Sequence, residues 1–194
     1  GIKMMKITCL VGSARTSGSC AYIVDTFIKG VKENNDDIEI KKYKVSTSKI
    51  NFCLGCKECY KNGECVQNDD VQIIVDDILS SDILFIATPS YWADVPGQLK
   101  TFFDRNTPFG NTNEKRIKFS KRGAKGIGIA IRAGKNEKEN TLILDFIDHY
   151  YGHLDIEPAC RISICETDSL NDLKEKHIDK INQVYDIGKN IKHL

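Results

Sequence analysis

The sequence carries almost no net charge, because 28 Lys and Arg residues face 27 Asp and Glu residues. Proteins that bind nucleic acid or an anionic membrane through electrostatics need a basic excess, so the composition argues against both partners. Long apolar runs are also missing: stretches such as Ile83 to Ala87 are far too short to cross a bilayer. Small molecules or other proteins are the partners that remain.

The amino end lacks the basic, apolar and small-residue regions of an export signal. We therefore expect a cytoplasmic protein, and we set Gly1 aside as a cloning remnant. With 194 residues and 41% hydrophobic content, the chain has enough apolar material for one core. The sequence thus predicts a single domain over 1–194.

Short apolar runs alternate with longer amphipathic stretches, a pattern typical of βαβ units around a mostly parallel sheet. We expect strands at 5–11, 38–45, 83–87, 126–131 and 156–165, and helices at 20–32, 70–79, 97–104, 137–151 and 170–192. The run at 83–87 is continuously apolar, which indicates a central strand covered on both faces. Asp69 and Asp70 can cap the helix that begins beside them. A long polar connection is expected at 106–121.

The loop at 12–19 reads Gly-Ser-Ala-Arg-Thr-Ser-Gly-Ser and leads from the first strand into a helix. A helix start offers unpaired N–H groups and a favourable dipole to a phosphate. Ser13 and Ser19 can donate hydroxyl groups, Cys20 a backbone N–H, and Arg15 a charge-assisted hydrogen bond. An ordinary turn that caps the helix explains the loop equally well. The loop is neither a P-loop nor a dinucleotide fingerprint, which disfavours nucleotide triphosphate hydrolysis.

The loop after the third strand, Thr88 to Pro96, holds Tyr91 and the only tryptophan, Trp92. In open α/β sheets the ligand lies beyond the carboxyl ends of the strands, at the point where the strand order reverses. Side chains just past a central strand therefore face this crevice more often than they close the edge of the core. The two rings are predicted to line a planar heterocycle.

The loop after the fourth strand, 132–135, borders the same crevice. Gly134 lets the backbone approach a ligand closely, and Arg132 or Lys135 could stabilise negative charge on a reduced ring. A solvated turn with basic residues is the alternative interpretation.

Three segments, Gly12 to Arg15 with Ser19, Thr88 to Trp92, and Gln98 to Arg105, together resemble the NAD(P)H-dependent FMN reductase family of flavodoxin-like proteins. The resemblance covers most of the chain and depends on the order and spacing of the segments. It implies an α/β fold, a flavodoxin-like three-layer α/β/α sandwich with a five-stranded parallel sheet in order 2-1-3-4-5. It also implies FMN as cofactor, NAD(P)H as co-substrate, and a homodimer or higher homo-oligomer in which a neighbouring subunit completes the flavin pocket.

The same resemblance assigns the FMN contacts. The phosphate would be held by Ser13, Arg15, Ser19 and Cys20. The ribityl chain and isoalloxazine would meet Pro89, Ser90, Tyr91 and Trp92, with Arg132, Ala133 and Gly134 at the other edge. Cys20 stands where the family usually has a hydroxyl residue, and Ala14 where proline is common. Because the chemistry takes place at flavin N5, we name no catalytic acid or nucleophile.

Four of the eight cysteines lie close together, at Cys53, Cys56, Cys59 and Cys65. Without an export signal, this clustering favours metal binding or redox chemistry over structural disulfides. The C-x2-C-x2-C spacing suits a [4Fe-4S] cluster better than a zinc ribbon, and it resembles the iron–sulfur flavoproteins of anaerobes. A redox disulfide or free thiols remain open alternatives. The cysteines expected in strands are predicted to be core residues: Cys9, Cys160 and Cys165.

The sequence therefore predicts an FMN-dependent oxidoreductase that takes electrons from NAD(P)H and passes them to a flavin, quinone or other small acceptor. The alternative is an iron–sulfur flavoprotein that carries electrons between protein partners. A third hypothesis, a structural zinc-binding regulator, predicts a colourless protein. The electron acceptor, the choice between NADH and NADPH, and the oligomer size stay open.

Overall fold

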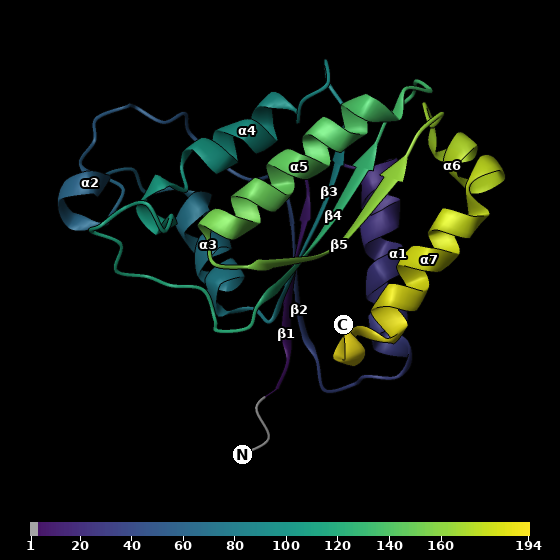
Figure 1. Ribbon diagram of the computed structural model, residues 1–194, viewed down its shortest axis with the longest axis horizontal. Coiled ribbons are helices and arrows are strands. Elements are labelled where there is room, and N and C mark those ends of the chain that lie inside the picture. Colours follow the sequence, from purple (N-terminus) through teal and green to yellow (C-terminus); the bar gives the residue numbers. More distant parts are fainter. Residues whose placement is uncertain (1–3) are drawn as a thin grey trace.

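The computed structural model describes residues 4–194, so the interpretation of Gly1 lies outside the described residues. Its centre is an all-parallel sheet of five strands in the order β2-β1-β3-β4-β5 (Figure 1). The strands are β1 Lys6–Val11, β2 Glu39–Lys44, β3 Ile83–Pro89, β4 Lys125–Ile131 and β5 Glu157–Ile164. The predicted flavodoxin-like strand order is confirmed.

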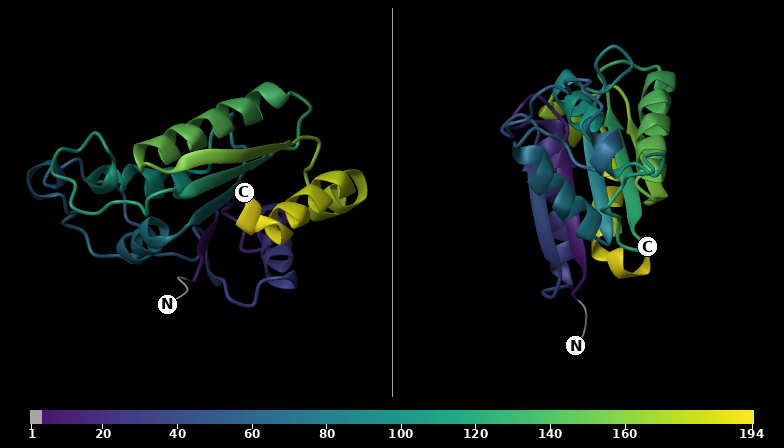
Figure 2. Two further views of the ribbon diagram at one scale, coloured as in Figure 1. Left: turned by 60° about the horizontal axis from the view of Figure 1, so that its bottom comes forward. Right: turned by 90° about the vertical axis from the view of Figure 1, so that its left-hand side faces the viewer.

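Helices cover both faces of the sheet (Figures 1 and 2). They are α1 Ser19–Glu33, α2 Cys59–Asn62, α3 Asp70–Ser80, α4 Gly97–Asp104, α5 Glu137–His153, α6 Leu170–Lys176 and α7 Ile178–Lys189, with single 3-10 turns at η1 Thr107–Phe109 and η2 Ile191–His193. One apolar cluster joins the sheet to α3, α4 and α5, and a second joins it to α1, α6 and α7. Over residues 4–194, no helix combines the length and the apolar character that crossing a membrane requires.

The central strand β3 is covered on both faces of the sheet, as its continuous apolar run predicted. Successive side chains of a strand point to opposite faces, so a strand covered on both sides must be apolar at every position. Phe85 packs toward α1, where its ring stacks on Phe27 with centroids 4.2 Å apart. Leu84 and Ile86 belong to the cluster on the other face. Alternate side chains of β3 are thus buried on opposite faces of the sheet.

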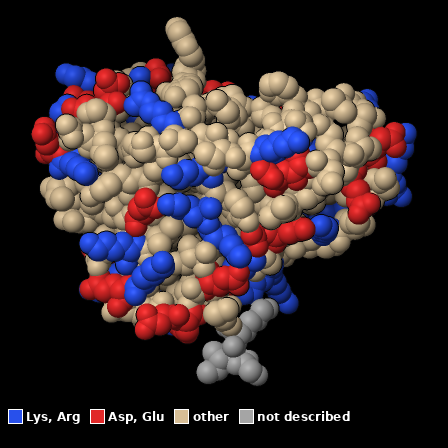
Figure 3. All heavy atoms as spheres, turned by 180° about the vertical axis from the view of Figure 1, so that it is seen from behind, with Lys and Arg blue, Asp and Glu red and all other residues tan. Residues whose placement is uncertain are grey.

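Charged side chains of both signs are mixed on one face of the molecule. On the face seen in Figure 3, Lys and Arg are interspersed with Asp and Glu. This distribution agrees with the near balance of 28 basic and 27 acidic residues. A field of one sign, which would attract a polyanion, does not cover this face.

The prediction of one long helix at 170–192 is wrong. The chain forms α6 and α7 with a break at His177, whose φ of −129° and ψ of 40° are not helical. The break allows α7 to lie along α1, where it buries Ile181, Val184 and Gly188. Neither glycine nor proline marks the break, so the local sequence gave no stop signal.

Two glycines set the close approach of α1 and α7. A Cβ atom at Gly30 would lie 2.1 Å from the carbonyl oxygen of Tyr185, and one at Gly188 would lie 2.3 Å from that of Phe27. Backbone atoms cannot yield as a flexible side chain can. We expect Gly30→Ala to lower the free energy of unfolding by about 1–3 kcal/mol, although alanine favours helix.

Urea denaturation followed by circular dichroism measures this effect. The matched control is Gly152→Ala in α5, where nothing beyond the neighbouring residues and backbone of the same helix lies within 4 Å of the added Cβ. The control is expected to be as stable as the native chain or up to about 1 kcal/mol more stable. Equal midpoints for Gly30→Ala and the native chain would contradict the close helix contact.

Candidate functional site

The loops that follow β1, β3, β4 and β5 meet at one edge of the sheet. Hydrogen bonds beyond the strands tie each loop to its neighbour. The amide of Gly12 donates to the carbonyl of Ala87 (2.8 Å), and the amide of Ser90 donates to that of Ile131 (2.8 Å). Arg132 donates in the same way to the last residue of β5 (2.9 Å). The crevice therefore lies at the reversal point of the strand order, as the sequence predicted.

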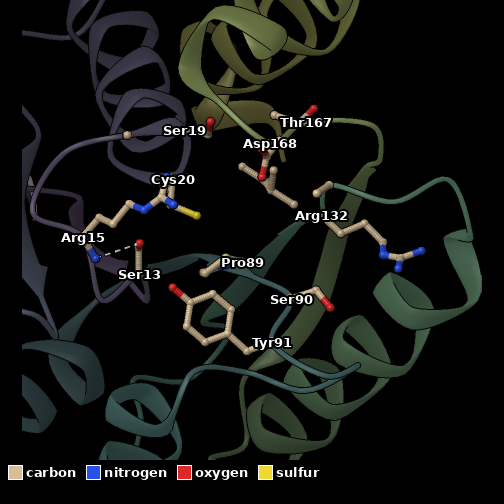
Figure 4. Close-up of a pocket in the computed structure, with 13 residues that line it drawn as sticks. Ser13, Arg15, Ser19, Cys20, Pro89, Ser90, Tyr91, Arg132, Thr167 and Asp168 are labelled. Atoms are coloured by element: carbon tan, nitrogen blue, oxygen red, sulfur yellow. Dashed lines mark hydrogen bonds between the residues drawn. The ribbon is translucent and has the colours of Figure 1, made fainter.

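A hollow of about 120 Å³ opens between these loops (Figure 4). Nine residues predicted as flavin contacts line it: Ser13, Arg15, Ser19, Cys20, Pro89, Ser90, Tyr91, Arg132 and Ala133. Segments that are far apart in the sequence are thus brought to one place. Trp92 and Gly134 are not among the lining residues, and all eleven assignments as FMN contacts remain predictions.

One wall of the hollow is the amino end of α1. Gly18 occupies the cap position with φ of 137°, and no side chain of the described residues caps the first turn. The first amides of a helix have no partner within the helix, so they can bind an anion here. The Ser13 hydroxyl accepts a bond from the Arg15 amide (3.1 Å), and the guanidinium of Arg15 turns back toward Cys20 (Figure 4). Hydroxyl, guanidinium and helix amides together suit a phosphate.

The thiol of Cys20 carries no negative charge that would repel an anion in the hollow. Burial raises the pKa of Cys20 to about 12, although the charge of Arg15 acts in the other direction. The thiol is therefore neutral at physiological pH. Cys20 stands where the family usually has a hydroxyl residue, so its side chain offers a weaker donor than a hydroxyl group would. The backbone N–H of Cys20 is still present.

The opposite wall comes from the loop after β3. Tyr91 and Asp94 exchange backbone hydrogen bonds of 2.8 and 3.1 Å across a tight turn. The two central residues, Trp92 and Ala93, have φ of 56° and 60°, a region that side chains other than glycine rarely adopt. The turn leaves Trp92 100% exposed, whereas the ring of Tyr91 borders the hollow (Figure 4).

The third wall of the hollow is formed by main-chain atoms and not by the basic side chains of Arg132 and Lys135. The side chain of Arg132 turns away from the hollow (Figure 4), and its guanidinium pairs with Glu139 at 2.8 Å. The side chain of Lys135 is 89% exposed, and its ammonium lies 4.0 Å from a carboxylate oxygen of Glu166. The main chain at 132–133 therefore forms this edge of the hollow.

Thr167 and Asp168 also line the hollow, and the sequence analysis missed them. They belong to the loop after β5, which is drawn inward because the Thr167 amide donates to the carbonyl of Arg132 (2.9 Å). Their position directly after an expected strand was the available signal. Loops at the same edge of a parallel sheet are all candidates for ligand contact.

The cysteine loop, residues 51–69, is a second feature of interest. It includes α2, which Figure 1 shows set apart from the sheet. Its four cysteines line a small cavity of about 30 Å³: Cys53, Cys56, Cys59 and Cys65. All eight cysteines are free thiols. Within residues 4–194, no three His, Cys, Asp or Glu side chains come together closely enough to hold a metal ion.

A buried ion pair between Arg105 and Asp69 lies at the end of the cysteine loop. The side chains of Arg105 and Asp69 are 1% and 0% exposed, and their charged atoms approach to 2.7 Å. Burial alone would raise the pKa of Asp69, but hydrogen bonds from Arg105 and from the amides of Asn51 and Val71 outweigh it and lower the pKa. Asp69 is also the cap of α3, as the sequence predicted, and the structure shows that it forms a capping box with Gln72.

The other cysteines lie elsewhere. Cys9 in β1 is completely buried, which confirms its predicted core position. Cys160 and Cys165, in and after β5, are half-buried. Cys160 packs against the apolar cluster that joins the sheet to α1, α6 and α7. The predicted core positions of Cys160 and Cys165 are therefore only partly buried.

A parallel sheet in this order, with a hollow beside the amino end of α1 at the point where the order reverses, defines a flavodoxin-like protein. The family model of NADPH-dependent FMN reductases matches residues 5–136, and the chain belongs to this family. It is similar to an iron-sulfur flavoprotein of Archaeoglobus fulgidus, with 34% identity over 137 residues, 71% of this chain and 59% of the relative. An iron-sulfur flavoprotein of Methanocaldococcus jannaschii is 35% identical over 147 residues, 75% of this chain and 71% of the relative.

Solved structures with much lower identity share the fold. An NAD(P)H:quinone oxidoreductase from Methanothermobacter marburgensis has a TM-score of 0.72 at 14% identity over 99% of both chains. An FMN-dependent NADH-azoreductase of Bacillus anthracis in complex with FMN has a TM-score of 0.69 at 16% identity, over 96% of this chain and 99% of that one. The likeness confirms the flavodoxin-like fold.

Proposed function

We propose that this protein is an FMN-dependent oxidoreductase that takes electrons from NAD(P)H and passes them to a flavin, quinone or other small acceptor. The observation that carries the proposal is the hollow at the amino end of α1, where free amides, a serine hydroxyl and Arg15 converge. This donor set fits a phosphate monoester. Membership of the NADPH-dependent FMN reductase family supports the same cofactor.

Each wall of the hollow has a distinct task in this proposal. Ser13, Arg15 and the first amides of α1 bind the phosphate. The ring of Tyr91 packs against the flavin, and the backbone at 132–133 offers polar groups to its edge. Bound FMN supplies the hydride and electron chemistry, so the protein's own contribution is binding and orientation.

Anaerobic oxidation of NADH or NADPH with added FMN and a quinone tests the reaction. We expect steady turnover that depends on both FMN and the quinone. A protein that only carries electrons between protein partners would show negligible turnover in this assay. That result would overturn the reductase proposal.

A second candidate function is electron transfer through a [4Fe-4S] cluster and FMN to protein partners. Four thiols that line one cavity favour it, because iron–sulfur clusters are held by cysteine thiolates. The two relatives above are named iron-sulfur flavoproteins. Cys53, Cys56, Cys59 and Cys65 would hold the cluster, and its loading requires the thiols of the loop to draw together.

Anaerobic purification with iron and zinc analysis tests the cluster. About four iron atoms per chain, with a broad absorption that bleaches on reduction, is the expected result. Bound zinc without iron would instead support the structural zinc alternative. Flavin colour with neither metal would leave the four cysteines as free thiols or a redox disulfide.

We also infer a homodimer. Trp92 is 100% exposed beside the flavin hollow, and an aromatic ring of this size is more often found covered. Light scattering after size-exclusion chromatography should give twice the 21.9 kDa mass of the chain. A monomeric mass at micromolar concentration would reject the dimer.

A further inference from the structure

Arg105 occupies an unusual place for a cation. It follows α4 directly, its side chain is 1% exposed, and it lines the cavity of the four cysteines. Removing a guanidinium from water is costly unless its donors are used. The partners of Arg105 therefore indicate what the residue does.

Two donor groups of Arg105 bind both ends of the cysteine loop. Nη1 donates to the carbonyl of Asn51 (2.9 Å) and to Oδ2 of Asp69 (2.7 Å), and Nη2 donates to Oδ1 of Asp69 (3.3 Å). The amide of Asn51 donates to the same carboxylate (2.9 Å). The first and last residues of the loop thus converge on one buried cation.

The third donor of Arg105 is not used. Its Nε–H is buried and has no hydrogen-bond partner among residues 4–194. Leaving a buried donor unpaired is unfavourable, and more so when the donor is charged. Cys65 lines the same small cavity as Arg105. A thiolate or a cluster sulfur at Cys65 is the acceptor that this position offers.

We propose that Arg105 is the positioning residue of the cysteine loop, fastening both loop ends and offering its free Nε–H to the sulfur of Cys65. The second half of this inference rests on the proposed cluster, whereas the first half concerns the chain alone. Lysine could not replace arginine, because one ammonium cannot reach three acceptors in a planar fork. An N–H bond to a ligand sulfur stabilises the reduced cluster and raises its reduction potential.

The experiment compares Arg105→Lys with the matched control Arg116→Lys. Arg116 lies on the same connection between α4 and β4 and pairs with Asp155 at 2.6 Å, away from the cysteine cavity. Two properties are measured: hydrogen exchange of peptides from 52–68 in the iron-free protein, and the reduction potential of the reconstituted protein by anaerobic titration. Iron content is recorded for every sample.

For Arg105→Lys we expect exchange in the loop to be at least about tenfold faster than in the native chain. We also expect less iron and a lower reduction potential. Arg116→Lys should match the native chain in all three. Loop exchange equal to that of the control would overturn the positioning role.

Two further outcomes are decisive. Faster exchange with an unchanged potential would refute the contact with Cys65, because a purely structural clamp does not alter the potential. A native chain that takes up no iron would refute the cluster, while the exchange measurement would still decide the clamp.

A second variant keeps the test open if Arg105→Lys fails to fold. Asp69→Asn removes the charge that holds Arg105 but keeps the oxygen that caps α3. We expect faster exchange in the loop, because a neutral amide binds the guanidinium of Arg105 less strongly than a carboxylate does. Native exchange rates in this folded variant would contradict the clamp.

Discussion

Replacing Arg15 by alanine is expected to weaken FMN binding by about 1.5–3 kcal/mol, a rise in Kd of about 10–150-fold. Arg15 lines the hollow beside Ser13 and the first turn of α1, so its guanidinium can form a charge-assisted bond to the phosphate. Titration of FMN with the protein, followed by flavin fluorescence, gives both dissociation constants. The loss should nearly disappear when riboflavin replaces FMN, because riboflavin has no phosphate.

The matched control for Arg15→Ala is Lys135→Ala. Lys135 also belongs to a loop at this edge of the sheet, but its side chain is 89% exposed and it does not line the hollow. Its removal should change the FMN affinity less than about twofold. Native FMN affinity in the Arg15→Ala variant would show that Arg15 does not contact the phosphate.

Replacing Cys56 by serine is expected to abolish iron binding and leave FMN in place. A cubane cluster is held by four thiolates, and a serine hydroxyl is a poor ligand for it. Cys56 lines the cysteine cavity and not the flavin hollow, so the two cofactors should respond separately. Iron analysis and the absorption spectrum after anaerobic reconstitution report both.

Cys160→Ser is the control for this variant. Cys160 is half-buried in β5, outside the cysteine loop, and should leave the iron content unchanged. Full iron in Cys56→Ser would reject the cluster assignment. Equal loss of iron in both variants would point to a general effect of reconstitution instead.

The fold could be predicted because its strongest determinants are local. The continuous apolar run at 83–87 placed β3 at the centre, and the predicted helix at 97–104 has the bounds of α4. The break at His177 could not be foreseen, because it depends on packing of α7 against α1 through Gly30 and Gly188. Tertiary contact overrides a helical pattern that has no stop signal of its own.

The candidate site was only partly predictable, because a sequence indicates which loop reaches the crevice but not where each side chain points. Arg132 illustrates this limit: its backbone lines the hollow, yet its guanidinium pairs with Glu139. Trp92 sits at the tip of a tight turn, so its ring stands in solvent while Tyr91 borders the hollow. The directions of these side chains depend on turn geometry and ion pairs.

The cysteine loop, too, could be predicted only in part from the sequence. The spacing of its cysteines was visible at once, whereas the residue that fastens it was not. Arg105 binds partners 36 and 54 positions away in the sequence, and such contacts leave no periodic pattern. The residue lay within the segment that resembles the reductase family, but its contacts came only from the structure.

The central claim is that a phosphate binds at the amino end of α1, and it is tested most directly by comparing FMN with riboflavin. The two ligands share the ring and the ribityl chain and differ in the phosphate alone. Isothermal titration of the native chain should give FMN an affinity at least about a hundredfold higher, because several charge-assisted bonds are lost with the phosphate. Equal affinities, or no binding of either ligand, would contradict the account.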